Sequence, residues 1–219
     1  MPRPSRHKLA ATALEQHGLT FAEDLGGGEV KNTPASLFRL LCFAHLASTP
    51  IRHEIAMAAT RALFQQGWTT PQKMANATWA DRTRTLNAAG YARYDESTAE
   101  RLGHNAQLLL DRYRGDLRRL RDEAKRDPDN ERQRLKAFKG IGDVGVDIFF
   151  RDAQVVWAEL YPFADRVALR SAASLGLPDD ARALARLVDD DPRAFARLVA
   201  ALVRIDLAKQ HEQVRHAAA

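Results

Sequence analysis

The residues whose pattern most clearly suggests a binding site are two glycines that flank one isoleucine, at Gly140, Ile141 and Gly142. Glycines on both sides allow a tight turn whose backbone comes close to another molecule, and Ile141 can anchor that turn in a core. Gly142 also leaves backbone N–H groups exposed at the start of the next helix, where the helix dipole favours a phosphate. The alternative interpretation is a glycine-rich connector between two packed helices. Taken alone, the pattern favours the connector.

A carboxylate follows this turn after about twenty residues. Asp165 lies in the segment 161–170, of sequence YPFADRVALR, and a Leu-Gly-Leu-Pro run follows at 175–178. An aspartate directly before a helix usually caps it, because the side-chain oxygen accepts hydrogen bonds from the first backbone N–H groups. By itself, Asp165 therefore indicates a helix cap.

Together, the glycine turn, the carboxylate that opens a helix and the Leu-Gly terminator resemble the helix-hairpin-helix DNA glycosylase superfamily, which includes endonuclease III, the adenine mismatch glycosylase and the alkyladenine glycosylases. The resemblance covers residues 34–178 and is strongest over 135–178. It implies an all-α, two-lobed fold that rotates a damaged nucleotide out of duplex DNA into a pocket between two helical lobes. It also implies that hairpin residues contact the DNA, namely Lys139, Gly140, Ile141, Gly142, Val144 and Gly145.

In this resemblance, Asp165 matches the catalytic aspartate of the superfamily. Cleavage of an N-glycosidic bond builds positive charge on the deoxyribose, so a fixed negative charge beside the sugar lowers the barrier. The same carboxylate could orient or deprotonate the attacking water. The base must leave the stack before it can be reached, which is easiest for damaged or mismatched bases.

The chain departs from the superfamily at functional positions of the hairpin and of the tail. Members that also cleave the DNA strand carry a lysine two residues after the second hairpin glycine, where this chain has Val144. Valine cannot form a Schiff base, so the resemblance implies a glycosylase without lyase activity. Lys139, directly before the hairpin glycines, is the alternative nucleophile. The tail of this chain lacks the four cysteines that hold the iron-sulfur cluster of endonuclease III. Ordinary side-chain packing must therefore hold the tail in place.

Other candidate residues are spread through the first half of the chain. Thr49 occupies the position where relatives place a glutamine that fills the space left by the flipped base, and His53 follows it; both are expected to approach DNA. Tyr91 and Tyr94 are candidates for the base pocket because either ring could stack on a base. The alternative, for at least one of them, is packing beside a helix end. His45 lies on an apolar helix face and is interpreted as a hydrogen-bonded core residue.

The composition is that of an ordinary globular chain. Of its 219 residues, 45% are hydrophobic and 28% charged, and 33 Lys and Arg against 28 Asp and Glu give a net charge of +5. No apolar run approaches the roughly 20 residues of a membrane span. The single cysteine, Cys42, rules out an internal disulfide and a thiolate metal site. The basic segment 1–8 lacks the apolar stretch of a signal peptide, so we expect a cytoplasmic, nucleoid-associated protein without a membrane partner. The arginine-rich run 112–121 is interpreted as a solvated helix face.

Helices must position these residues. Apolar residues recur at every third or fourth position along almost the whole chain, and no segment alternates like a strand, which predicts an all-α fold. Thr33 and Pro34 begin one helix, Ser97 and Glu100 form a predicted capping box, and the residues after Lys209 are expected to fray. The expected helices span 9–17, 34–47, 51–66, 71–76, 79–88, 97–113, 116–126, 130–138 and 146–158, with two more between 180 and 209.

The sequence thus predicts a monomeric glycosylase of base excision repair whose substrate is double-stranded DNA with a damaged or mismatched base. A central helical barrel is expected over residues 51–145, and a second lobe from residues 1–50 and 146–219. We expect no cofactor, no metal held by side chains and no iron-sulfur cluster, although the resemblance allows a monovalent cation at the hairpin carbonyls. Three alternatives stay open: a bifunctional glycosylase and AP lyase, a non-catalytic helix-hairpin-helix DNA-binding module, and a helical scaffold without DNA affinity.

Overall fold

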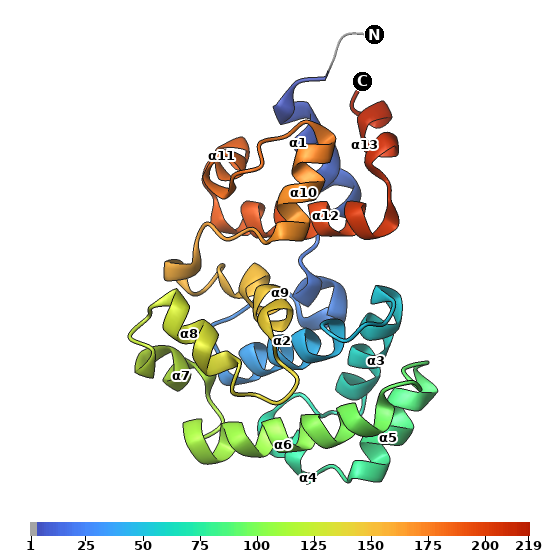
Figure 1. Cartoon of the computed structure of the whole chain (residues 1–219), viewed down its shortest axis with the longest axis vertical. Coiled ribbons are helices and arrows are strands. Elements are labelled where there is room, and N and C mark those ends of the chain that lie inside the picture. Colours follow the sequence, from blue (N-terminus) through green and yellow to red (C-terminus); the bar gives the residue numbers. More distant parts are fainter. Residues whose placement is uncertain (1–3) are drawn as a thin grey trace. The chain divides into compact units, whose positions relative to one another are not determined.

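A computed structural model describes residues 4–219 of the chain, and Figure 1 shows the arrangement of its helices. These residues form thirteen α-helices joined by turns and short 3₁₀ and π segments, and they contain no β-strand, which confirms the all-α prediction. No helix in this range is long and apolar enough to span a membrane. The first three residues of the basic segment 1–8 lie outside the described range.

Residues 25–149 form a compact group of helices that we call the hairpin unit. Five of its helices begin with a Thr or Asp whose side chain accepts a hydrogen bond from a first-turn backbone N–H, and three of these five carry proline in the first turn. The helix α6 packs along α4 and α5 (Figure 1). The helices are α2 (Pro34–Ala47), α3 (His53–Gln65), α4 (Pro71–Asn76), α5 (Trp79–Ala88), α6 (Asp95–Tyr113), α7 (Leu117–Glu123), α8 (Pro128–Leu135) and α9 (Asp143–Ala153), of which the last, α9, continues into the second unit at Phe150.

The hairpin unit differs from the expected central barrel in its first helix. Residues 25–50 were expected in the second lobe, but they belong to the hairpin unit, whereas the observed end at Phe149 lies close to the expected end at residue 145. The reason is that α2 is buried along most of its length, from Leu37 to Leu46, and packs against α3 and α7. A helix with so little polar surface must be covered by neighbours on several sides.

The start of α6 also differs from the prediction. The helix begins at Asp95, whose buried carboxylate accepts hydrogen bonds from Asn87 Nδ2 at 2.7 Å and from the backbone N–H of Glu96 at 2.7 Å. Ser97 Oγ instead donates to the carbonyl oxygen of Tyr94 at 3.2 Å. The capping-box prediction is therefore wrong, because a residue two positions earlier already satisfies the helix start.

Residues 4–24 and 150–219 form the second compact group, which we call the terminal unit. Its centre is α12, in which Leu198, Leu202 and Val203 are buried and against which α1 and α10 pack, so ordinary packing holds the tail as predicted. Val214 is also buried and α13 packs against α1 and α10, so the expected fraying after Lys209 is not observed. The helices are α1 (Arg6–His17), α10 (Arg166–Leu175), α11 (Ala181–Ala185), α12 (Pro192–Ala208) and α13 (His211–Ala217).

One arginine of α12 fixes the segment that follows α1. Arg204 donates to the carbonyl oxygens of three residues between His17 and Thr20 and to the carboxylate of Asp24 at 3.2 Å. Its guanidinium carbon lies 4.3 Å from the centre of the Phe21 ring. The carbonyl oxygens after a helix end have no backbone N–H partner within the helix, so Arg204 provides the hydrogen-bond donors that they lack.

Candidate functional site

The predicted hairpin joins α8 to α9 at residues 136–142. Phe138 and Ile141 are buried, and the backbone N–H of Ile141 donates to the carbonyl oxygen of Phe138 at 3.0 Å, which closes the turn. Lys139 and the two glycines of the turn are exposed. Ile141 therefore anchors the turn in the core, as the sequence predicts, and leaves the residues around it facing solvent.

Gly140 can be replaced by no other residue without strain. Its φ of +81° lies in the left-handed region that favours glycine. A Cβ on this residue would lie 2.9 Å from Cε1 of His45 and 3.2 Å from Cδ of Arg101. The turn is therefore shaped both by its backbone angle and by side chains from two other helices.

Asn105 of α6 holds the hairpin backbone at two points. Its Oδ1 accepts a hydrogen bond from the backbone N–H of Lys139 at 2.8 Å, and its Nδ2 donates to the carbonyl oxygen of the same residue at 2.9 Å. Nδ2 also lies 3.3 Å from Nδ1 of His45. Sequence reasoning did not identify Asn105, because a single polar residue inside a long amphipathic helix gives no sign of which distant backbone it binds.

His45 is the hydrogen-bonded core histidine that the sequence predicts. It is buried, and burial together with the nearby charge of Arg101 lowers the pKa of its imidazole to about 4. The ring is therefore neutral at physiological pH and contributes no positive charge beneath the hairpin.

The second hairpin glycine differs from the first. A Cβ on Gly142 would meet no atom within 4 Å, and its carbonyl oxygen accepts from the backbone N–H of Val146 at 3.0 Å, so α9 begins directly after an exposed glycine. Val144, in the first turn, is 59% exposed. Gly145 is buried instead, and a Cβ there would lie 3.3 Å from Cγ2 of Ile141, so Gly145 provides helix packing. Of these three residues, only Gly142 and Val144 face solvent.

Most cations on the hairpin have carboxylate partners. Nζ of Lys136 lies 2.9 Å from Oδ1 of Asp143, and Nη2 of Arg132 lies 2.7 Å from Oδ1 of Asp147. Lys139 forms no ion pair with any described residue. The exposed tip of the hairpin therefore carries a positive charge that its neighbours do not neutralise.

Thr49 and His53 lie in the same unit as the hairpin. Thr49 is half-buried and its hydroxyl donates to the carbonyl oxygen of His45 at 3.4 Å. His53, the first residue of α3, packs edge-on against Phe43 with ring centres 6.3 Å apart. Their expected contacts with DNA stay predictions.

The two candidate base-pocket tyrosines have different environments. Tyr91 is fully buried and its hydroxyl donates to the carbonyl oxygen of Leu46 at 3.1 Å, so it has no exposed ring face and follows the packing alternative. Tyr94 is half-buried and has the guanidinium of Arg93 5.2 Å from its ring centre. Tyr94 also lines a hollow of about 530 Å³ together with Trp79. Only Tyr94 keeps a surface on which a base could stack.

The candidate catalytic carboxylate, Asp165, belongs to the terminal unit. It is the N-cap of α10, and its Oδ1 accepts from the backbone N–H groups of Val167 at 2.7 Å and Ala168 at 3.1 Å. Its Oδ2 accepts from Nε of Arg151, in an ion pair between two buried side chains. Asp165 is thus a rigidly held, charge-balanced carboxylate.

Two residues near the end of α9 hold the segment around Asp165, and sequence reasoning missed both. Besides Arg151, Gln154 accepts from the backbone N–H of Phe163 at 2.9 Å and donates to its carbonyl oxygen at 3.0 Å. A signal existed for Arg151, which lies among apolar positions of its helix. A charged residue at a buried position requires a partner of opposite charge.

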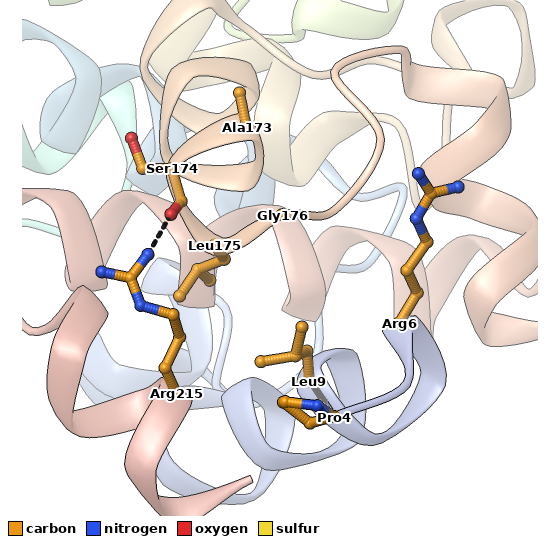
Figure 2. Close-up of a pocket in the computed structure, with 8 residues that line it drawn as sticks. All are labelled: Pro4, Arg6, Leu9, Ala173, Ser174, Leu175, Gly176 and Arg215. Atoms are coloured by element: carbon orange, nitrogen blue, oxygen red, sulfur yellow. Dashed lines mark hydrogen bonds between the residues drawn. The ribbon is translucent and has the colours of Figure 1, made fainter. Parts of the chain in front are cut away.

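A separate cavity of about 370 Å³ lies in the terminal unit (Figure 2). Pro4, Leu9 and Leu175 provide its apolar walls, and Arg6 and Arg215 flank it. Figure 2 shows Arg215 donating to the carbonyl oxygen of Ser174, at 2.5 Å. None of the residues predicted from the sequence as functional lines this cavity.

The residues described give no support for a metal site. They contain no group of three or more His, Cys, Asp or Glu side chains that could hold an ion, and burial raises the pKa of the Cys42 thiol. At the hairpin, the carbonyl oxygens of Phe138 and Lys139 already accept hydrogen bonds, from Ile141 and Asn105. A monovalent cation there would have to share these oxygens with the two donors.

Comparison with known proteins finds no matching family model, no matching curated protein and no matching solved structure. The site must therefore be interpreted from its own geometry and from the sequence resemblance.

Proposed function

We propose that this chain binds duplex DNA through the hairpin between α8 and α9 and hydrolyses the N-glycosidic bond of a damaged or mismatched base, with Asp165 as the catalytic residue. The observation that carries the DNA-binding part is the exposed hairpin tip. There, Gly142 opens α9 without a side chain, and the ammonium group of Lys139 has no carboxylate partner among the described residues. Exposed N–H groups at a helix start and an unneutralised cation both favour a phosphate.

The reaction proposed for Asp165 is a hydrolysis. Water adds to C1′ of the deoxyribose, the bond from C1′ to the base nitrogen breaks, and the base leaves with the bonding electrons and takes up a proton. Positive charge builds on the sugar before water adds, and a nearby carboxylate stabilises it. The three donors on Asp165 hold its oxygens in place, and a carboxylate in a fixed position suits electrostatic stabilisation of the sugar.

The proposed enzyme has no lyase step at position 144. An AP lyase needs an amine that attacks C1′, and Val144 offers none. If Lys139 served as the nucleophile instead, borohydride would trap a covalent adduct on abasic DNA, and Lys139→Ala would abolish it. We expect no such adduct, and its appearance would favour the bifunctional alternative.

One observation favours a second candidate, a non-catalytic DNA-binding module. The contacts of Asp165 are those of a structural residue, since it caps α10 and neutralises a buried arginine. A module of this kind would bind duplexes through the hairpin and recruit partners, and Asp165 would matter only for stability.

Substitution of Gly142 tests the DNA-binding part. Gly142→Val places a branched side chain where the free protein has open space, so the variant should fold with a melting temperature close to that of the wild type. Because the added atoms occupy the space in which a phosphate would approach the N–H groups of α9, we expect weaker binding to a short duplex by fluorescence anisotropy. If the folded variant binds like the wild type, or if wild-type binding does not weaken with salt, the hairpin is not a DNA contact.

A further inference from the structure

Arg101 of α6 lies against the hairpin from outside it. Its Cδ lies 3.2 Å from the position that a Cβ on Gly140 would take, so this methylene group occupies the side of the turn where another residue would carry a side chain. Arg101 comes four residues before Asn105, and positions four apart lie on the same face of a helix. The helix face that binds the hairpin backbone therefore also brings an arginine to the turn.

The charge of Arg101 is not balanced locally. The residue is exposed and forms no ion pair with any carboxylate in the described part of the chain. Lys139, adjacent to Gly140, is in the same situation, whereas Lys136 and Arg132 of the same hairpin are paired with aspartates. Unneutralised like charges at one turn repel each other, and a bound anion would relieve that repulsion.

The buried layer beneath the two cations supports this arrangement. His45 underlies Gly140 and is neutral at physiological pH, so it adds no repulsion. Asn105 fixes the backbone of Lys139 with two hydrogen bonds, which sets where its side chain leaves the turn. The backbone that carries one cation is thus fixed before any ligand binds, so no backbone entropy is lost there on binding.

We propose that Arg101 is a second phosphate-binding residue of the hairpin, acting with Lys139 on the sugar-phosphate backbone of duplex DNA. The proposal rests on the proposed DNA-binding function and assigns part of it to a residue on a different helix. Arginine suits the role because its planar group can donate two parallel hydrogen bonds to one phosphate. A phosphate contact carries no base information, so Arg101 should strengthen binding to intact and damaged duplexes equally.

The test compares duplex binding of the full-length wild type, Arg101→Met, Arg101→Lys and the control Arg119→Met over a range of salt concentrations. Methionine keeps a flexible stem against Gly140 and removes the charge, and lysine keeps the charge. Arg119 is an exposed arginine of α7 in the run interpreted as solvated. We expect Arg101→Met to bind about tenfold more weakly at low salt and to lower the slope of log affinity against log salt by about one. Arg101→Lys should keep the slope, and Arg119→Met should match the wild type.

The outcomes separate the two proposals. If the wild type binds duplex DNA and Gly142→Val weakens it, but Arg101→Met binds no worse than Arg119→Met with an unchanged slope, the role of Arg101 is refuted and the hairpin contact stands. If the wild type does not bind, the proposed function fails first. Should Arg101→Met lose its fold by circular dichroism, Arg101→Gln in the same assay decides, because glutamine also removes the charge.

Discussion

Replacement of Gly140 by alanine is the most informative perturbation of the hairpin, because Gly142 provides a matched control two residues away. Both glycines are exposed and both belong to the same turn. Gly140 has a φ of +81° and a filled space where a Cβ would lie, whereas Gly142 has neither feature. The two alanine variants add the same methyl group and differ in the backbone angle at the substituted residue and in the atoms that the methyl group meets.

The expected difference follows from two contributions. Alanine in the left-handed region costs about 1 to 2 kcal/mol. The new Cβ would lie 2.9 Å from Cε1 of His45, closer than real Cβ contacts. His45 is buried and next to Asn105, so it has little freedom to move away, and such overpacking typically costs about 1 to 3 kcal/mol. We therefore expect Gly140→Ala to lower the free energy of unfolding by about 2 to 5 kcal/mol, and Gly142→Ala by less than about 1 kcal/mol.

Urea denaturation followed by far-ultraviolet circular dichroism measures both variants. The midpoint for Gly140→Ala should fall well below that of the wild type, and the midpoint for Gly142→Ala should stay close to it. Equal midpoints for the two variants would show that the turn does not have the conformation described, and the account of the hairpin would be refuted.

Three further predictions concern stability. The folded pKa of His45, about 4, lies below its ordinary value of 6.5, so the unfolded chain binds more protons between these values and stability falls as the pH drops from 6.5 to 4. His45→Gln should remove up to about 3 kcal/mol of this acid sensitivity in urea titrations at several pH values. An unchanged slope of stability against pH would contradict the burial of the ring. Asp152 behaves in the opposite sense, and its Oδ2 accepts from the backbone N–H of Ala22 at 2.9 Å. Burial raises its pKa from 3.8 to about 6, so its contribution to stability falls as the pH rises through that range. Asp152→Asn should flatten this fall in the same titrations. Arg204→Lys should lower the free energy of unfolding by about 2 to 3 kcal/mol, because lysine cannot serve several carbonyl oxygens and Asp24 at once; thermal denaturation equal to the wild type would show that these bonds contribute little.

The fold class and most helices could be predicted because their signals are local. Thr33 followed by Pro34 places the start of α2, and the apolar spacing along α12 marks its buried face. The start of α6 was missed because a capping box is a weak pattern, and Asp95 satisfies the helix start through Asn87, a contact that sequence spacing does not reveal. The grouping of α2 with the hairpin unit depends on packing between helices, which local patterns do not specify.

The candidate site was predicted only where backbone geometry dictates residue type. The glycine turn requires Gly140 for its positive φ, and Ile141 for its anchor, so both are visible in the sequence. Asn105 and Arg101 reach the hairpin across 34 and 39 positions of sequence, counted to Lys139 and Gly140, and nothing local marks them. Side chains that act on a distant backbone can be assigned only once the chain is folded.

The proposed activity depends on Asp165, and its substitution requires a control for the buried arginine. Asp165→Asn keeps an oxygen that can cap α10 but removes the ion-pair partner of the buried Arg151, a loss that typically destabilises a protein by about 3 to 5 kcal/mol. The double variant Asp165→Asn with Arg151→Met removes both charges, so it should recover stability without restoring a carboxylate. Circular dichroism on both variants separates loss of fold from loss of chemistry.

The most direct measurement is base release from a panel of duplex oligonucleotides, each with one lesion or mismatch, followed by alkali to cleave at abasic sites. We predict that the wild type produces alkali-dependent strand breaks at one or more lesions, and that the folded double variant still binds these duplexes but produces no breaks. Breaks of equal yield with the double variant, or no breaks at any lesion by a wild type that binds the duplexes, would contradict the assignment of Asp165 as a catalytic residue and favour the non-catalytic module.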